Sequence, residues 1–148
     1  MQRSLVLIKP DAIQRGLAGQ IISRLERRGL KIVAMKMLLM DKTLAQRHYA
    51  IHQGKAFFDD LVSFITSSPI IAIVFQGNSA VEIVRQTIGE TDPAKAHAGT
   101  IRGDFGIDIA HNLIHGSDSP ENATKEIALF FSAGEISSYD RDLDRWIY

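Results

Sequence analysis

The strongest structural signal in the sequence is the segment Pro69–Gln76, PIIAIVFQ, in which six apolar residues follow one another without interruption. An apolar run of this length predicts a buried strand. A membrane-spanning helix needs about 20 apolar residues, so this run is far too short to cross a bilayer. The chain is therefore expected to fold around a sheet and to have no membrane partner.

Three further segments predict strands, and the segments between them predict helices. The other strands are expected at Ser4–Lys9, Lys31–Met40 and Asn112–His115, and the helices at Leu17–Arg28, Asp41–His52, Phe57–Thr66, Ala80–Ile88 and Ser119–Phe131. Four strands with two principal crossovers fit a ferredoxin-like β-α-β-β-α-β plait, an α+β fold in which helices cover one face of a four-stranded antiparallel sheet. A doubly wound parallel sheet is the alternative, because a helical hairpin separates the second and third strands.

The length of 148 residues predicts a single domain covering residues 1–148. Apolar residues make up 45% of the chain and charged residues 23%, which is ordinary for a soluble globular protein. A long loop is expected between Glu90 and Gly106, where glycines recur and apolar periodicity is weak, and such loops are usually functional. A polar tail, Gly134–Tyr148, follows the last helix and ends in Trp-Ile-Tyr.

The composition excludes several kinds of site and partner. The absence of cysteine excludes disulfides, thiol nucleophiles and cysteine-based metal centres. The 17 basic and 17 acidic residues give zero net charge without a basic stripe, so no nucleic-acid partner is expected. Neither a P-loop nor a dinucleotide-binding glycine motif occurs. The apolar stretch at the N-terminus is cut by Lys9 and is too short for a signal peptide, which predicts a cytoplasmic location.

Two histidine pairs have a spacing that can bind a metal, His48 with His52 and His111 with His115. On a helix, histidines four residues apart share a face and can hold zinc. No third ligand is evident for the first pair. The second pair lies at the two ends of a predicted strand, where four residues span roughly 13 Å, too far to share one ion. A metal site made by the protein itself is therefore not expected.

The segment Asn112–Ser119, NLIHGSDS, places His115 at the end of a predicted strand, before glycine and small polar residues. Glu126 follows in the middle of the next predicted helix. A carboxylate that binds one imidazole nitrogen leaves the other free to act as a nucleophile or base. The same pattern also fits a surface histidine beside a helix N-cap, and the residues alone leave both interpretations open.

Three other features are candidates for ligand binding. Arg85, Thr91 and Arg102 surround the glycine-rich loop and can form an anion site, because arginine matches phosphate oxygens. Lys9 ends an apolar strand, where a lysine is unusual. Phe57 precedes Phe58, and two adjacent rings cannot both face the core, so one can stack on a base. Solvated arginines, a snorkelling lysine and a ring at a helix contact are the alternatives.

At these positions the sequence closely resembles the nucleoside diphosphate kinases, and the resemblance covers essentially the whole chain. Its most specific element is Asn112–Ser119, which is similar to the family's active-site signature N-x-x-H-G-S-D-S. Six shorter motifs match in the same order, at Ile8–Asp11, Gln14–Gly16, His48–Tyr49, Phe57–Phe58, Gly89–Pro93 and Gly99–Asp104. The resemblance implies the plait rather than the parallel sheet, and a catalytic His115 rather than a surface one.

The resemblance also implies a role for each site residue. His115 would be the nucleophile that takes the γ-phosphate on Nδ1, Glu126 would orient it through the other ring nitrogen, and Ser117 would hydrogen-bond that carboxylate. Tyr49 would help to position the transferring phosphate. The remaining residues would bind the nucleotide: the phosphates by Arg85, Thr91, Arg102 and His52, the sugar hydroxyls by Lys9 and Asn112, and the base by Phe57, Ile109 and Leu61.

The activity implied by the resemblance is reversible, ping-pong transfer of the γ-phosphate from a nucleoside triphosphate, mainly ATP, to a nucleoside or deoxynucleoside diphosphate. Mg²⁺ is the implied cofactor, held mainly by nucleotide phosphates and water rather than by protein ligands. Two rival classes are a catalytically silent nucleotide-binding relative and a phosphohistidine carrier. The first would be expected to lose His115, Glu126 or an arginine. The second would not need Phe57, Lys9 and Asn112, and the whole set is present.

The departures from the family pattern are few. Ala56 and Ala98 stand where many members have proline, and both changes are expected to loosen loops more than to alter chemistry. The tail reaches Trp146-Ile147-Tyr148, as in the longer members that form hexamers. A homo-oligomer is therefore expected, with a hexamer as the prediction and a tetramer as the alternative.

Overall fold

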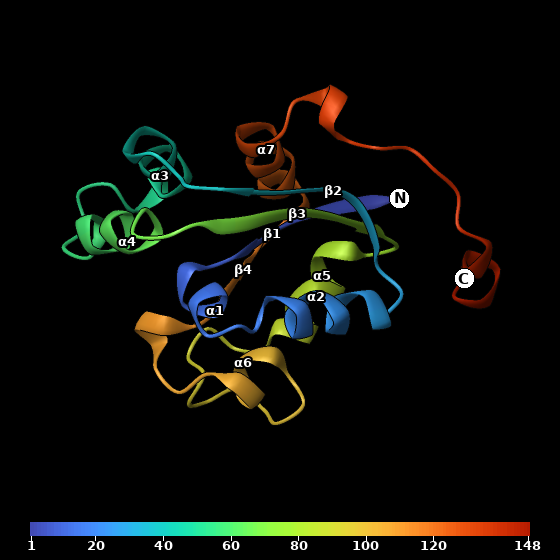
Figure 1. Cartoon of the computed structure of the whole chain (residues 1–148), viewed down its shortest axis with the longest axis horizontal. Helices are drawn as coiled ribbons and strands as arrows, with labels where there is room; N and C mark the ends of the chain where they lie inside the picture. The colour runs from blue at the N-terminus through green and yellow to red at the C-terminus, as the bar shows by residue number, and fades with distance from the viewer.

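Residues Gln2–Ile8 and Ile70–Gly77 form β1 and β3, the central strands of a four-stranded sheet in the computed structural model, which describes residues 1–148 (Figure 1). Strand β2 (Lys31–Leu38) pairs with β3, and β4 (Ile114–Gly116) pairs with β1, so the order is β2-β3-β1-β4. Every neighbouring pair is antiparallel. This arrangement confirms the α+β plait and excludes the doubly wound parallel sheet.

Helices cover both faces of the sheet, so the expectation of helices on one face was wrong. The reason lies in β1, where Leu5 and Leu7 pack into one hydrophobic cluster while Val6 and Ile8 pack into another. A strand with apolar residues at every position needs cover on both sides. The first cluster lies under α3 (Lys42–His48), α4 (Phe58–Ile65) and α7 (Pro120–Phe130), and the second under α2 (Ala18–Arg27) and α5 (Ala80–Ile88) (Figure 1).

Two short helices lie where none was expected. Helix α1 (Pro10–Gln14) begins one residue after β1 ends, with proline at its first position. Helix α6 (Ile101–Phe105) lies in the expected long loop, and the Thr100 side chain caps it by accepting a hydrogen bond from Gly103 N–H. Five residues make little more than one turn, which is too short for apolar periodicity to reveal.

Polar side chains cap two of the predicted helices at their N-termini. The Asp41 side chain accepts a hydrogen bond from Leu44 N–H at the start of α3. The Ser119 side chain does the same for Asn122 N–H at the start of α7, where Pro120 takes the first helical position. Helix α3 is shorter than expected, because a turn at Tyr49 separates it from a short 3₁₀ helix, Ala50–His52.

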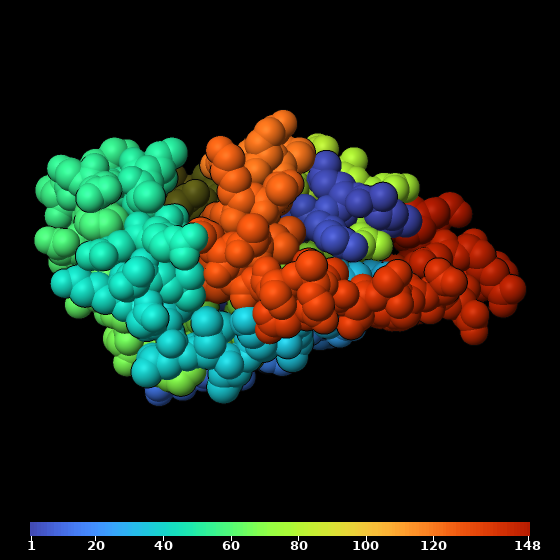
Figure 2. Space-filling model, turned by 90° about the horizontal axis from the view of Figure 1, so that it is seen from above, coloured from blue at the N-terminus to red at the C-terminus, as the bar shows by residue number.

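The C-terminal tail runs along the outside of the molecule and reaches one end of it, as the red segment in Figure 2 shows. The Arg141 guanidinium fastens the tail by donating to the carbonyls of Gly29 at 2.9 Å and Leu30 at 3.3 Å. Trp146 nevertheless remains 80% exposed. No helix of the chain is both long enough and apolar enough to cross a membrane.

Candidate active site

A cleft of about 1240 Å³ opens between the α3–α4 region and the segment from α5 to β4. It brings together residues that lie far apart in the sequence. Every residue assigned to the site from the sequence lines this cleft except Ser117, which is fully buried behind Glu126. The residues on the cleft wall are Lys9, Tyr49, His52, Phe57, Leu61, Arg85, Thr91, Arg102, Ile109, Asn112, His115 and Glu126.

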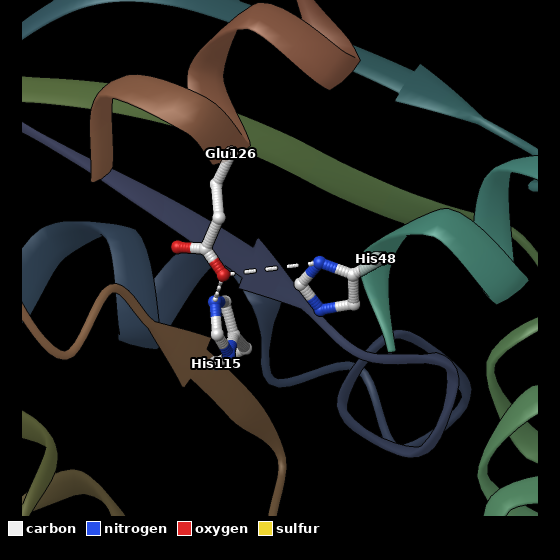
Figure 3. A group of neighbouring side chains, drawn as sticks. All are labelled: His48, His115 and Glu126. Carbon is white, nitrogen blue, oxygen red and sulfur yellow. Dashed lines mark ion pairs between the residues drawn. The ribbon is translucent and has the colours of Figure 1, made fainter. Parts of the chain in front are cut away.

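His115 and Glu126 form an ion pair in the cleft, with 2.9 Å between Nε2 of the imidazole and Oε2 of the carboxylate (Figure 3). The Ser117 hydroxyl donates to the other carboxylate oxygen at 2.6 Å. Burial would raise the pKa of Glu126, but the hydrogen bond and charge of His115, together with the Ser117 hydroxyl, outweigh it and lower that pKa below its usual value. Because Glu126 occupies Nε2, Nδ1 is the nitrogen that His115 can offer to a ligand.

His48 belongs to the same group, although its sequence position did not predict a role in the site. Its side chain is 2% exposed, and its ring stands edge-on to the His115 ring with 4.8 Å between centroids. Burial, followed by the neighbouring His115, lowers the pKa of His48 to about 3, so the ring is neutral near neutral pH. Sequence spacing could not show that His48, at the end of α3, meets His115 in β4, but the family motif His48-Tyr49 was a signal.

The structure groups the histidines differently from the two pairs that the sequence spacing suggested. His111 lies in a short 3₁₀ helix, Ile109–His111, instead of at the start of a strand, and its ring packs edge-on against Phe64. The group that could bind an ion is His48, His115 and Glu126, whose donor atoms lie within 4.8 Å of one another. Two imidazole nitrogens suit zinc better than magnesium, which prefers oxygen ligands. This group is therefore a poor fit for Mg²⁺.

Lys9 and Asn112 form a polar pair on the cleft wall. The Lys9 ammonium donates to Asn112 Oδ1 at 2.8 Å, and the Asn112 amide donates to the Thr91 carbonyl at 3.1 Å. Burial, and then the positive charge of Arg102, lower the pKa of Lys9 to about 8. The lysine that ends an apolar strand thus points into the cleft rather than out to solvent, and it carries a readily lost proton.

The two arginines occupy different environments. Arg85 is exposed on α5, whereas Arg102 is only 8% exposed. The Arg102 guanidinium donates to three backbone carbonyls, those of Asn112 at 3.1 Å, Gly89 at 3.2 Å and Ile114 at 2.6 Å. Burial, and then the charge of Arg85, lower the pKa of Arg102 to about 10. Arg102 therefore anchors the backbone next to His115 as well as facing the cleft, a role that the sequence did not indicate.

The double phenylalanine divides as expected, with one ring exposed and one buried. Phe58 packs into the core, and Phe57 is 46% exposed at the mouth of the cleft. The Phe57 ring lies 5.3 Å from the ring of His52. Ile109 is 56% exposed on the wall of the same cleft. An exposed aromatic ring and an exposed branched apolar side chain on the walls of one cleft provide apolar surface on which a flat ring can stack.

Tyr49 lies behind the histidines. It is 9% exposed, and its ring stands edge-on to the His48 ring with 4.7 Å between centroids. Burial raises the pKa of Tyr49 to about 12, so the phenol keeps its proton and can act as a hydrogen-bond donor.

Comparison with known proteins gives one consistent result. Residues 2–136 match the family model described as nucleoside diphosphate kinase. A nucleoside diphosphate kinase from Roseiflexus sp. (strain RS-1) is 56% identical over 148 residues, covering 100% of this chain and 99% of the relative. One from Archaeoglobus fulgidus is 53% identical over 148 residues, covering 100% of this chain and 98% of the relative.

Solved structures agree with these relatives. A halophilic nucleoside diphosphate kinase from Halobacterium salinarum, in complex with CDP, superposes with a TM-score of 0.97 at 52% identity, covering 99% of this chain and 98% of the other. A nucleoside diphosphate kinase family protein from Babesia bovis gives a TM-score of 0.97 at 40% identity with full coverage of both chains. With the family model, the relatives and the fold in agreement, this chain belongs to the nucleoside diphosphate kinase family.

Proposed function

We propose that this enzyme transfers the γ-phosphate of a nucleoside triphosphate, mainly ATP, to a nucleoside diphosphate in two steps, through a phosphohistidine at Nδ1 of His115. The observation that supports this most strongly is the ion pair of His115 Nε2 with Glu126, which is itself fixed by Ser117. Nucleophilic catalysis needs an oriented imidazole with one nitrogen free to attack. His115 meets this requirement on the wall of a cleft that is large enough for a nucleotide.

In the first step the Nδ1 lone pair attacks the γ-phosphorus. The N–P bond forms as the bond from phosphorus to the β–γ bridging oxygen breaks, and the nucleoside diphosphate leaves with that oxygen. Positive charge develops on the imidazole, and the Glu126 carboxylate at Nε2 stabilises it. The second step is the reverse reaction with a different diphosphate, so the overall exchange of one phosphoanhydride for another is freely reversible.

Charge neutralisation is the other requirement of phosphoryl transfer. In this proposal Lys9, Arg85 and Arg102 supply positive charge from the cleft wall, while Thr91 and His52 contact phosphate oxygens. Mg²⁺, when bound to the phosphates and water, neutralises further charge on the nucleotide.

The nucleotide is proposed to bind with its base against Phe57 and Ile109, above Leu61, and with its sugar hydroxyls on Lys9 and Asn112. Stacking reads no hydrogen-bonding edge of the base, so purine and pyrimidine nucleotides should all be accepted. The Halobacterium salinarum relative was solved in complex with CDP, a pyrimidine diphosphate, which supports the acceptance of pyrimidine nucleotides.

Initial-rate kinetics test the two-step scheme. If the first product leaves before the acceptor enters, double-reciprocal plots against one substrate at several fixed concentrations of the other are parallel lines. Lines that intersect would contradict the scheme, because they require both nucleotides on the enzyme together. The His115→Ala variant is expected to abolish turnover. Glu126→Gln should retain slow turnover, since a neutral amide holds the imidazole but cannot balance its charge.

We also propose that the chain assembles into a homo-oligomer, a hexamer, with a tetramer as the alternative. Two exposed apolar surfaces support assembly. On and just after the edge strand β2, Met35, Met37 and Leu39 are 52%, 60% and 63% exposed, and in the tail Trp146 is 80% exposed. Light scattering on the purified full chain should give the mass of six copies. A monomer would contradict the proposal, and a tetramer would replace the hexamer.

A further inference from the structure

The backbone two residues before His115 makes an unusual turn. Leu113 has a φ of +75°, in the left-handed region that a branched side chain rarely adopts. Ile114 N–H donates to the Asn112 carbonyl at 2.9 Å across it, which makes a three-residue γ-turn of the rare kind with positive φ. The Leu113 side chain is fully buried in the core, so the turn is tightly enclosed. Strain of this kind persists only where the surroundings enforce it.

Hydrogen bonds enforce this turn from several sides. Asp11 Oδ2 accepts from Leu113 N–H at 3.0 Å, and Lys9 N–H donates to the Leu113 carbonyl at 2.9 Å. The Arg102 guanidinium holds the carbonyls on either side, those of Asn112 and Ile114. Asp11 is the only side chain among these partners that bonds to Leu113 itself.

Asp11 makes this contact at a cost in stability, because only one of its two carboxylate oxygens has a partner. Its second carboxylate oxygen, Oδ1, is buried and has no hydrogen-bond partner. An unpaired buried carboxylate oxygen destabilises the folded protein, so a residue selected for stability alone would be expected to have partners for both oxygens. Such a group calls for an explanation in function.

The turn lies between two parts of the site. On one side is Asn112, whose side chain is joined to Lys9 and to the Thr91 carbonyl. On the other side is His115, carried by the three-residue strand β4. The shape of the turn therefore sets the position of the histidine relative to a nucleotide held by Lys9 and Asn112, and a misplacement of about 1 Å can slow a reaction about hundredfold.

We propose that Asp11 is a positioning residue, which holds the strained turn at Leu113 so that His115 meets the phosphate of a nucleotide bound at Asn112. The proposal rests on the proposed function, in which His115 is the nucleophile. The plainer reading is that Asp11 only provides a favourable negative charge in the first turn of α1. That reading predicts an effect on stability alone.

Two variants separate the hydrogen bond from the charge. Asp11→Asn removes the charge but keeps a side-chain oxygen that can accept from Leu113 N–H, whereas Asp11→Ala removes both. The loss of charge next to Lys9 is the same in both variants, so their difference isolates the acceptor. Glu135→Gln is the matched control, because Glu135 also accepts a backbone N–H, that of Ser132, in the tail away from the cleft.

The full-length enzyme is measured for kcat, for the dissociation constant of ADP, and for hydrogen exchange of the Leu113 amide by NMR on leucine-labelled protein. Asp11→Ala is expected to lower kcat by about tenfold to hundredfold while the ADP constant stays within about threefold. Its Leu113 amide should exchange faster than in the parent. Asp11→Asn should recover most of kcat and of the amide protection, and Glu135→Gln should match the parent.

Equal loss of kcat in the alanine and asparagine variants would overturn the proposal, because the charge rather than the acceptor would then matter. An unchanged kcat in Asp11→Ala, with the Leu113 amide deprotected, would overturn it as well. A thermal unfolding curve checks that each variant is folded. Failure of the proposed function is recognised separately, since the unmodified enzyme would then carry no phosphoryl group on His115.

Discussion

The Nδ1 atom of His48 lies 3.9 Å from Oε2 of Glu126 and has no hydrogen-bond partner, although the His48 side chain is 2% exposed. A shift of about 1 Å would bring the two atoms within hydrogen-bonding distance. A neutral His48 can then donate to the carboxylate while Glu126 holds the charged imidazole of His115. We therefore expect His48 to support the Glu126 carboxylate when the His115 imidazole is charged.

A pair of His48 variants tests this support. His48→Asn keeps a side-chain amide donor near the Nδ1 position, and His48→Phe keeps the ring shape without a donor. Since a hydrogen bond to a charged group contributes about 1.5–3 kcal/mol, the phenylalanine variant should be phosphorylated by ATP at least about tenfold more slowly. The asparagine variant should lose much less. Rapid-quench measurement of the phosphorylation rate compares them, and equal rates would show that the donor is unimportant.

Burial of neutral His48 also predicts how stability depends on pH. Its pKa in the folded state is about 3, below the usual value of 6.5, so the unfolded chain binds a proton that the folded protein does not. Stability from this group is complete above about pH 6.5 and falls as the pH drops below it. Between about pH 7.5 and pH 5 the loss should be on the order of 2 kcal/mol.

Denaturant unfolding at fixed protein concentration measures that loss. In the His48→Phe variant the free energy of unfolding should depend less on pH over the same range, because phenylalanine has no proton to take up. The carboxylates contribute in a separate window, since the pKa of Glu126 is lowered and its stabilisation disappears only below about pH 4.5. Parallel profiles in the parent and the variant above that pH would contradict the assignment to His48.

We expect the deprotonation of Lys9 to set the alkaline limit of activity. Its pKa of about 8 means that the ammonium loses its charge as the pH rises above that value, and nucleotide binding should weaken in step. Lys9→Arg should extend activity to higher pH, because an arginine remains protonated there. Tyr49→Phe should leave the alkaline decline of activity at the same pH, since the pKa of Tyr49 is about 12. The pH dependence of kcat/KM distinguishes these outcomes, and a limb unmoved in Lys9→Arg would exclude Lys9 as its source.

We expect Ser117 to influence the acid limit of the phosphorylation rate through Glu126. Its hydroxyl donates to Glu126 at 2.6 Å and helps to lower the pKa of that carboxyl. Ser117→Ala should therefore raise the pKa of Glu126 and move the acid limb of the phosphorylation rate to higher pH. Ser119→Ala is the matched control, because it removes a helix cap worth about 1 kcal/mol of stability without touching Glu126. A shift of the limb in both variants would point to a general loss of stability.

We expect Phe57 to contribute to nucleotide affinity without discriminating between bases. Loss of the exposed ring in Phe57→Ala should weaken ATP, GTP and CTP by similar factors, corresponding to about 1–3 kcal/mol each. Phe58→Ala serves as the contrast, since Phe58 is buried and its loss should lower stability. Dissociation constants from calorimetry test this. A loss confined to purines would show that Phe57 reads the base.

The sequence predicted the element order because the longer helices and strands have clear apolar patterns, as in Ile70–Gly77. It missed helices α1 and α6, which are too short to show a period. It also placed the last strand two residues too early, at Asn112, because the positive φ of Leu113 bends the backbone there. The residue types of Asn112-Leu113-Ile114 do not predict that turn, because the side chains that hold it, Asp11 and Arg102, come from other parts of the chain.

The site shows the same division. Motif residues such as His115 and Phe57 could be named from the sequence, because a family pattern specifies them position by position. The contacts of Arg102 with three carbonyls, and the approach of His48 to Glu126, depend on how segments far apart in the chain pack together, such as α3 against α7. Spacing along the chain carries no information on such contacts, which is why the histidine pairs suggested the wrong partners.

The position of the phosphoryl group tests the central claim most directly. The enzyme is incubated with ATP radiolabelled at the γ-phosphate and no acceptor, then digested in alkali and analysed for the two isomers of phosphohistidine. Because Glu126 occupies Nε2, the label is predicted on Nδ1 of His115, lost in acid, removed by GDP, and absent from His115→Ala. A label on Nε2, or an acid-stable label on Ser117 or Ser119, would contradict the account.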